Sequence, residues 1–305
     1  MNLLTDLMHN TMRNTVSDLH QSGLQQSVAR PARHLRALLP VVCSALLGLS
    51  LLPASAHAHR TFLLPSSTVV AGNAPWVSVD AAAATDVFYF DHVALALDTL
   101  VISTPDGSDA KPENIGNGKF RSSFDLRLPQ TGSYKISLVS QNLFANYKDN
   151  GVVKRWRGTA ENLSKEIPAT AQELQVTQVQ SRVETFVTNG KPSQQALSIS
   201  GKGLEMAAIS HPNDLVAGEA AQFRLMLDGK PAMAVKVTVI AGGIRYRQQL
   251  GEQHVLTDAD GKFSIQWQGA GMYWLEASVK DDKSTVALAK ERRASYAATL
   301  EVLPQ

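Results

Sequence analysis

The sequence predicts an all-β protein with two immunoglobulin-like β-sandwich domains that follow a cleaved signal peptide. Three observations support this fold class. From Phe62 onward, short runs of β-prone residues recur between turn signals such as Pro105-Asp106-Gly107. No helical period of apolar residues persists in either half of the chain. Ahead of the first run, a positively charged segment, an apolar segment and small residues follow one another, which is the order of a secretory signal.

The pattern divides the 305 residues into segments with different expected roles. We expect a signal peptide over 1–56 (or 1–58), an N-terminal β-sandwich over 57–190 with a long insertion near 148–182, a linker over 191–204, and a C-terminal immunoglobulin-like β-sandwich over 205–305. Met8 and Met12 are alternative start positions.

The signal peptide determines where the mature chain resides. Arg30, Arg33 and Arg36 precede an apolar run that is shorter than the roughly 20 clean apolar residues of a membrane-spanning helix. Cleavage would remove Cys43, the single cysteine, and would leave equal numbers of basic and acidic residues. We therefore expect a soluble periplasmic protein without disulfides. Nucleic acid is not an expected partner, because the chain has no basic block.

The N-terminal half contains five runs that are expected to form strands. They cover residues 75–82, 86–92, 99–107, 119–128 and 131–139. The insertion that follows is polar and charged, with Trp156 as its large anchor. Within it, residues 160–167 predict a short helix that ends before Pro168. A return strand is expected over 181–189.

The C-terminal half repeats the same rhythm of short strands and turns. Residues 257–263 predict a hairpin with Gly261 at its tight turn, where the backbone needs a positive φ. About seven strands of this kind are typical of an immunoglobulin-like sandwich.

Two histidines at the signal cleavage site are the main candidates for chemistry. Small residues allow cleavage after Ala56 or after Ala58. The first frame leaves His57-Ala58-His59 at the terminus. Its amine, two amide nitrogens and the His59 imidazole would surround Cu(II) or Ni(II) in a square plane. The second frame leaves His59 first, so that its amine and imidazole chelate one ion together with a second histidine from the fold. This arrangement is similar to that of copper carriers and copper monooxygenases built on β-sandwiches.

His92 is the candidate for that second histidine. Asp91 could orient its imidazole, although strand alternation would place Tyr89 and Asp91 on one face and Phe90 and His92 on the other. The remaining histidines fit structural roles better. His211 precedes a proline in a turn, and His254 lies on a hairpin strand.

Several segments together resemble a known family. They are HRTFLLPSS, WVSVDAA, VFYFDH, ETFVTNGKPS, GKGLEM, SHPNDLVAGE, LDGKPA and TDADGKF. They are similar to those of a bacterial periplasmic family of unknown function that is associated with nickel and cobalt uptake beside a membrane transporter. The resemblance covers essentially the whole mature chain. It implies a secreted two-sandwich protein that handles a transition metal.

The expected function is that of a periplasmic accessory protein that binds nickel, cobalt or copper through His57, His59 and His92 and presents it to an inner-membrane transporter. An alternative is a non-catalytic β-sandwich module that binds a cell-surface protein or glycan. A copper oxidase that uses the terminal histidine is a third possibility. We expect no hydrolase, because the sequence lacks the motifs of serine and zinc hydrolases and the phosphate-binding loop.

Overall fold

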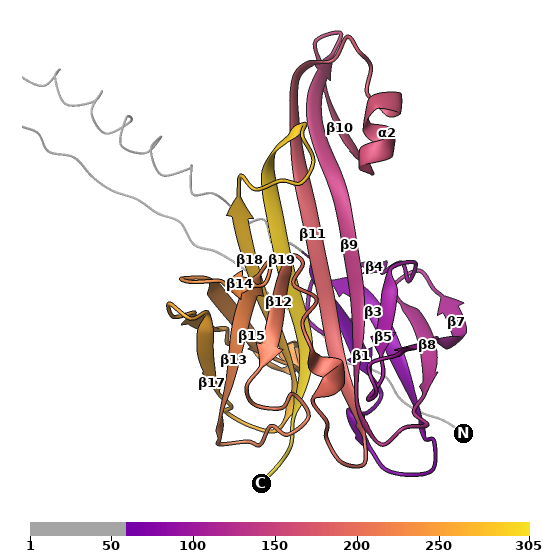
Figure 1. Ribbon diagram of the computed structural model, residues 1–305, viewed down its shortest axis with the longest axis vertical. Coiled ribbons are helices and arrows are strands. Elements are labelled where there is room, and N and C mark those ends of the chain that lie inside the picture. The colour runs from indigo at the N-terminus through magenta and orange to yellow at the C-terminus, as the bar shows by residue number, and fades with distance from the viewer. Residues whose placement is uncertain (1–58) are drawn as a thin grey trace, which may run out of the picture. The chain divides into compact units, whose positions relative to one another are not determined.

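Three β-sheets make up the part of the chain that the structure, a computed structural model, describes, which is residues 59–305. The predicted signal peptide and His57 lie outside the described residues. No helix within 59–305 is long and apolar enough to cross a membrane. The prediction of a mostly β protein built from sandwiches is confirmed (Figure 1).

The largest sheet is central and draws strands from both halves of the chain. Its strand order is β16-β15-β18-β19-β11-β9-β5-β6, with β10 added to β9 and β2 added to β11. The bounds are β16 (Gln253–Leu256), β15 (Lys236–Ala241), β18 (Gly271–Asp281), β19 (Ala289–Val302), β11 (Gln172–Asn189), β9 (Gly132–Asp149), β5 (Leu100–Ser103), β6 (Asp109–Ala110), β10 (Val152–Gly158) and β2 (Val69–Val70).

Two smaller sheets cover the central one. The N-terminal outer sheet contains β1 (Arg60–Pro65), β3 (Trp76–Ala84), β8 (Ser122–Arg127), β7 (Glu113–Asn117) and β4 (Val93–Ala94). The C-terminal outer sheet contains β12 (Leu204–Ala208), β13 (Ala220–Leu227), β14 (Lys230–Pro231) and β17 (Lys262–Gln266). The short helices are α2 (Ala160–Glu166), η2 (Gln195–Leu197) and η3 (Ile244–Tyr246).

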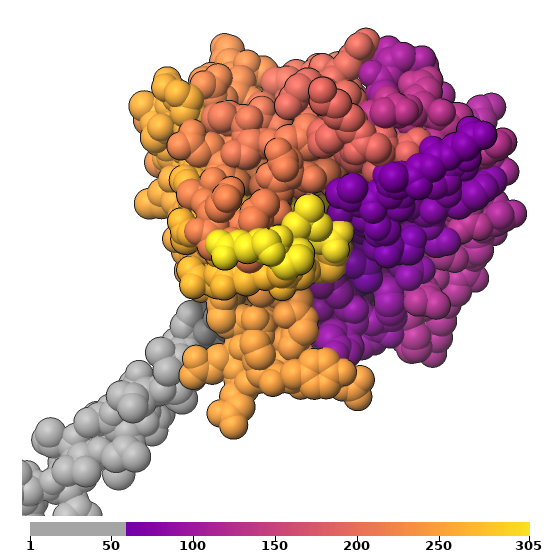
Figure 2. All heavy atoms as spheres, turned by 90° about the horizontal axis from the view of Figure 1, so that it is seen from below, coloured from indigo at the N-terminus to yellow at the C-terminus, as the bar shows by residue number. Residues whose placement is uncertain are grey.

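The outer sheets lie on opposite faces of the central sheet. Successive side chains of a strand point to opposite faces, and β11 shows the consequence. Phe186 belongs to the core beneath the C-terminal outer sheet, whereas Val183 and Val187 belong to the core beneath the N-terminal outer sheet. The last residues of the chain contact residues of both the N-terminal and the C-terminal half. Leu303 exchanges backbone hydrogen bonds with Leu215 and Ala217, and the β2 region lies near the same chain end (Figure 2).

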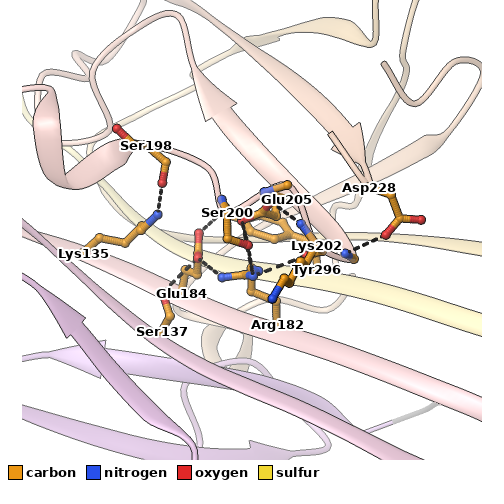
Figure 3. A network of polar contacts seen from close by, with 12 residues as sticks. Lys135, Ser137, Arg182, Glu184, Ser198, Ser200, Lys202, Glu205, Asp228 and Tyr296 are labelled. Carbon is orange, nitrogen blue, oxygen red and sulfur yellow. Dashed lines mark hydrogen bonds and ion pairs between the residues drawn. The ribbon is translucent and has the colours of Figure 1, made fainter. Parts of the chain in front are cut away.

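The two halves join where β11 pairs in parallel with β19. A buried ionic network crosses this junction (Figure 3). Arg182, 8% exposed, lies between the carboxylates of Glu184 (3.2 Å) and Glu205 (3.3 Å). Glu184 also accepts hydrogen bonds from Ser137 Oγ at 2.9 Å and from Tyr296 Oη at 2.9 Å. Burial, with a contribution from Glu184, raises the pKa of Tyr296 well above its usual range, so this hydroxyl remains a donor.

The stretch 191–204, which the sequence suggests as a linker, is packed against the fold. Ala196 and Leu197 in η2 are buried. The backbone N–H groups of residues 200–202 donate to the Glu205 carboxylate at 2.7–3.2 Å. A shared sheet and these contacts therefore hold the two sandwiches together, and the described residues 59–305 belong to one compact unit.

The insertion near 148–182 extends the central sheet. β9 and β11 each run for 18 residues, because they pair with each other along nearly their whole length. The return strand is consequently longer than the predicted 181–189. The predicted helix is present as α2 and ends before Pro168. Trp156 anchors the insertion, since its Nε1 donates to Glu166 at 2.8 Å and its ring packs on a small core that includes Leu163.

Replacing Arg182 with methionine should destabilise the protein strongly. The change leaves two buried carboxylates without their cation, which costs about 3–5 kcal/mol when one partner of a buried pair is removed. Urea unfolding followed by circular dichroism would measure it. The matched control is Arg293→Met on β19, whose ion pair with Glu291 is exposed and should contribute little. Equal losses in both variants would contradict a structural role for the buried network.

Candidate functional site

The end of β3 brings the two candidate histidines of the described chain together. β1 runs along one edge of β3 and pairs Arg60 with Ala84. β4 pairs with β3 through Val93 and Ala83. His59 directly precedes β1 and His92 directly precedes β4, so both lie beside the last residue of β3.

The imidazole rings of His59 and His92 are stacked. Their centroids are 3.4 Å apart and their planes differ by 3°. Both side chains are exposed to solvent. Within residues 59–305, no further His, Cys, Asp or Glu joins them in a group of three metal ligands. The sequence-predicted pair is therefore adjacent, without a third side chain of these types beside it in the described residues.

The segment that carries His92 is a loop, so the predicted strand over 86–92 is wrong. Two features interrupt the extended backbone. Tyr89 N donates to Asp86 O at 3.1 Å in a turn, and Phe88 has a φ of 65°. A positive φ is costly for a bulky residue and needs compensation from its surroundings. Phe88 and Phe90 supply it by packing against the buried Phe62, with ring centroids 5.3 and 5.9 Å away.

Because the segment is not a strand, the alternation expected for residues 89–92 does not apply. Asp91 also has a different partner from the one predicted. Its Oδ1 accepts a hydrogen bond from Thr85 N at 2.9 Å, which closes the loop on itself. The carboxylate therefore fixes the backbone that carries His92.

Arg60 holds the backbone next to His59 in place. It is 8% exposed although it directly follows His59. Its Nη1 donates to Thr85 O at 2.6 Å, and its Nη2 lies 3.4 Å from Glu252 Oε1. Its guanidinium lies 5.8 Å from the centre of the Trp274 ring. Thr85 is thus bonded to Arg60 on one side and to Asp91 on the other, which links the backbones of the two histidine segments.

Residues of the C-terminal half also contact the start of β1, next to His59. Trp274 Nε1 donates to Thr61 O at 2.9 Å, so β1 is tied to β18 just after its first residue. Burial raises the pKa of the nearby Glu276 carboxyl, and the positive charge of Arg60 opposes that shift. The surroundings of the histidine pair are therefore built by both halves of the chain.

The other two histidines of the described residues lie away from the pair. His211 Nε2 lies 3.0 Å from Ser133 Oγ, and its Nδ1 accepts from Asn213 N in the predicted turn. Burial lowers the pKa of the His211 imidazole. His254 lies on the hairpin strand β16, 3.5 Å from Glu252. The structure brings neither of them to the His59–His92 pair.

The donor set fits a transition metal ion. Two neighbouring imidazoles are suitable ligands for zinc, copper, iron and nickel, and cleavage after Ala58 would add the amine of His59 as a third nitrogen. Sequence reasoning found both histidines but missed Arg60 and Glu252. An arginine at an inward position of an apolar strand was the available signal for Arg60. No local pattern marks Glu252, which reaches the site only through tertiary structure.

No curated protein matches. The solved structures that match include the D0-D1 domain of intimin, at 14% identity and a TM-score of 0.21, covering 79% of this chain and 97% of that chain. A marsupial T cell receptor matches at 11% identity and a TM-score of 0.19, covering 81% of this chain and 74% of that chain. Similarities this low support no argument about function.

The family comparison is more specific. A family model described as "Domain of unknown function (DUF4198)" matches residues 56–281, which includes the histidine pair, Arg60 and Glu252. The match carries no link to nickel or cobalt uptake, so that association stays a prediction. The chain belongs to the DUF4198 family.

Proposed function

We propose that this protein is a periplasmic transition-metal-binding accessory protein. It holds nickel, cobalt or copper at its processed N-terminus and presents the ion to a membrane transporter. The observation that carries the proposal is the contact between His59 and His92, whose ring centroids are 3.4 Å apart at the end of β3. The nitrogen lone pairs of an imidazole lie in its ring plane, so the stacked rings bind one ion together when one of them turns about its side-chain bonds, a motion that exposed side chains make readily.

The position of His59 favours the cleavage frame after Ala58. In that frame the terminal amine belongs to the same residue as the first imidazole, and His92 supplies the second imidazole. Cleavage after Ala56 would instead use the amine of His57 and backbone amides and would leave His92 without a role. The contact between the rings of His59 and His92 supports cleavage after Ala58.

Three nitrogen donors favour copper among the candidate metals. Divalent copper binds such sites more tightly than nickel or cobalt, and it accepts a planar arrangement of nitrogen ligands. Because both imidazoles are exposed, an ion held there remains accessible to another protein. This accessibility suits a carrier that hands its ion on.

The mature protein should begin at His59. Small residues at positions 56 and 58 satisfy signal peptidase, and only this start gives His59 a free amine. Intact mass of the protein purified from the periplasm would measure the N-terminus. A mass that corresponds to a start at His57 would support the alternative frame, and a mass that retains Cys43 would refute processing.

Metal titration distinguishes the two frames. For a protein that starts at His59, His92→Ala should weaken Cu(II) binding by at least about 10–100-fold. That is the loss seen when a residue that is only hydrogen-bonded to a metal ligand is removed. Acetylating the amine of His59 should be at least as harmful, because it converts the amine into an amide and supplies no new amine. His59→Ala should abolish the site. For a protein that starts at His57, His92→Ala should have little effect.

The control for this titration is His211→Gln, which removes a histidine that contacts Ser133 and Asn213 and no residue of the site. It should leave Cu(II) affinity unchanged. If all the variants bind like the wild type, the histidine pair is not a metal site.

Metal binding should weaken as the pH falls. Protons compete with the ion for the amine and both imidazoles, so binding releases protons and the apparent affinity decreases in acid. Titrations with Cu(II) between neutral and mildly acidic pH would show this decrease. The protein acetylated at His59 has one fewer titrating donor and should show a shallower slope. Identical slopes would argue against the amine as a ligand.

A further inference from the structure

An exposed basic loop adjoins the histidine pair. The loop, residues 242–251, connects β15 to β16 and contains η3. Ile244 is buried in the core beneath the N-terminal outer sheet, and Leu250 packs against the same core. These two anchors leave the residues between them in solvent. Tyr246 is 87% exposed, the highest value among the large apolar and aromatic side chains of residues 59–305.

Three contacts fasten the basic loop to the two histidine segments. The Arg245 guanidinium lies 5.6 Å from the centre of the Tyr89 ring, three residues before His92. Gly242 faces Phe88 so closely that a Cβ there would lie 3.2 Å from the ring. Glu252, which directly follows the loop, pairs with Arg60. The loop therefore has a fixed position beside the segments that carry His59 and His92.

The loop is positively charged. Residues 242–251 contain Arg245 and Arg247 and no acidic residue. Within residues 59–305, neither arginine of the loop forms an ion pair: Arg245 stacks on Tyr89, and Arg247 donates to Ala241 O. Both charges are thus free to meet an anionic group.

We propose that the basic loop docks an acidic protein surface, that of the partner which receives the metal ion. This inference rests on the proposed function. Tyrosine and arginine are the residue types that are enriched at protein interfaces and at their hot spots. Charge complementarity mainly accelerates association, which is the step that a carrier needs when it delivers its ion.

The charge of the loop fits an acidic protein better than a lipid surface. Recognition of an anionic membrane by charge typically uses clusters of 4–8 basic residues. The basic loop has two arginines, and its central residue is a single exposed tyrosine. A small patch of this composition matches the core of a protein contact.

Metal transfer to defined acceptors tests the inference. Two synthetic peptides would share an amino-terminal Gly-Gly-His chelating sequence and differ in a tail of aspartates or of lysines. Stopped-flow measurement with the Cu(II)-loaded mature protein should show transfer to the acidic peptide about tenfold faster at low ionic strength. High salt should remove the difference, because it screens exposed charges.

Arg247→Glu leaves the loop with no net charge and should make the two transfer rates nearly equal. The matched control is Arg155→Glu in the similar sequence Arg155-Trp156-Arg157 on β10, which changes the net charge identically. This control should keep the preference for the acidic peptide. The Cu(II) affinity of each protein is measured first, so that only equally loaded proteins are compared.

The outcomes separate this inference from the proposed function. If the mature protein binds no metal, the proposed function fails before any transfer is measured. If it binds Cu(II) but transfers it to both peptides at the same rate, or if Arg155→Glu acts like Arg247→Glu, the docking surface is overturned while metal binding stands. Loop-dependent binding to anionic lipid vesicles, without a preference between the peptides, would also overturn it.

Discussion

The parallel pairing of β11 with β19 is the constraint on which the other features of this protein depend. It joins strands that are separated by about a hundred residues of chain and converts two sandwiches into one layered body. The pairing is accompanied by a buried cation, Arg182, between Glu184 and Glu205. Removal of one partner from such a group leaves an uncompensated buried charge, so separating β11 from β12 here would be costly.

The shared sheet also explains where the candidate site lies. One face of the central sheet carries the N-terminal outer sheet, and β15, β16 and β18 extend that face into the C-terminal half. The start of β1 therefore contacts residues from both halves, as Arg60 and Trp274 demonstrate. Two independent sandwiches on a flexible linker could not hold Glu252 beside Arg60. The geometry of the histidine pair thus depends on contacts far away in the sequence.

Features that neighbouring residues determine could be predicted from the sequence, whereas features that depend on contacts between distant residues could not. Turn residues and alternation predicted most strands and the helix α2, because those features are fixed within a few residues. The aromatic run before His92 reads as a strand, but the packing of Phe88 and Phe90 on Phe62 bends it into a loop. The candidate ligands were predictable from the cleavage site, whereas their contact depends on the register of β1, β3 and β4. The packing of residues 191–204 likewise depends on Glu205, which no local pattern marks.

The proposed site has an order of assembly built into it. Before cleavage, the nitrogen of His59 is an amide in a peptide bond to Ala58, and its lone pair is not available as an amine donor. Cleavage creates the amine next to an imidazole that already touches His92. Arg60, bonded to Thr85 and Glu252, holds the backbone next to His59 beside the His92 segment, which reduces the conformational entropy that is lost when an ion binds. On the proposed function, folding therefore prepares two of the three donors, and export with cleavage supplies the third, which confines metal loading to the compartment where the ion is collected.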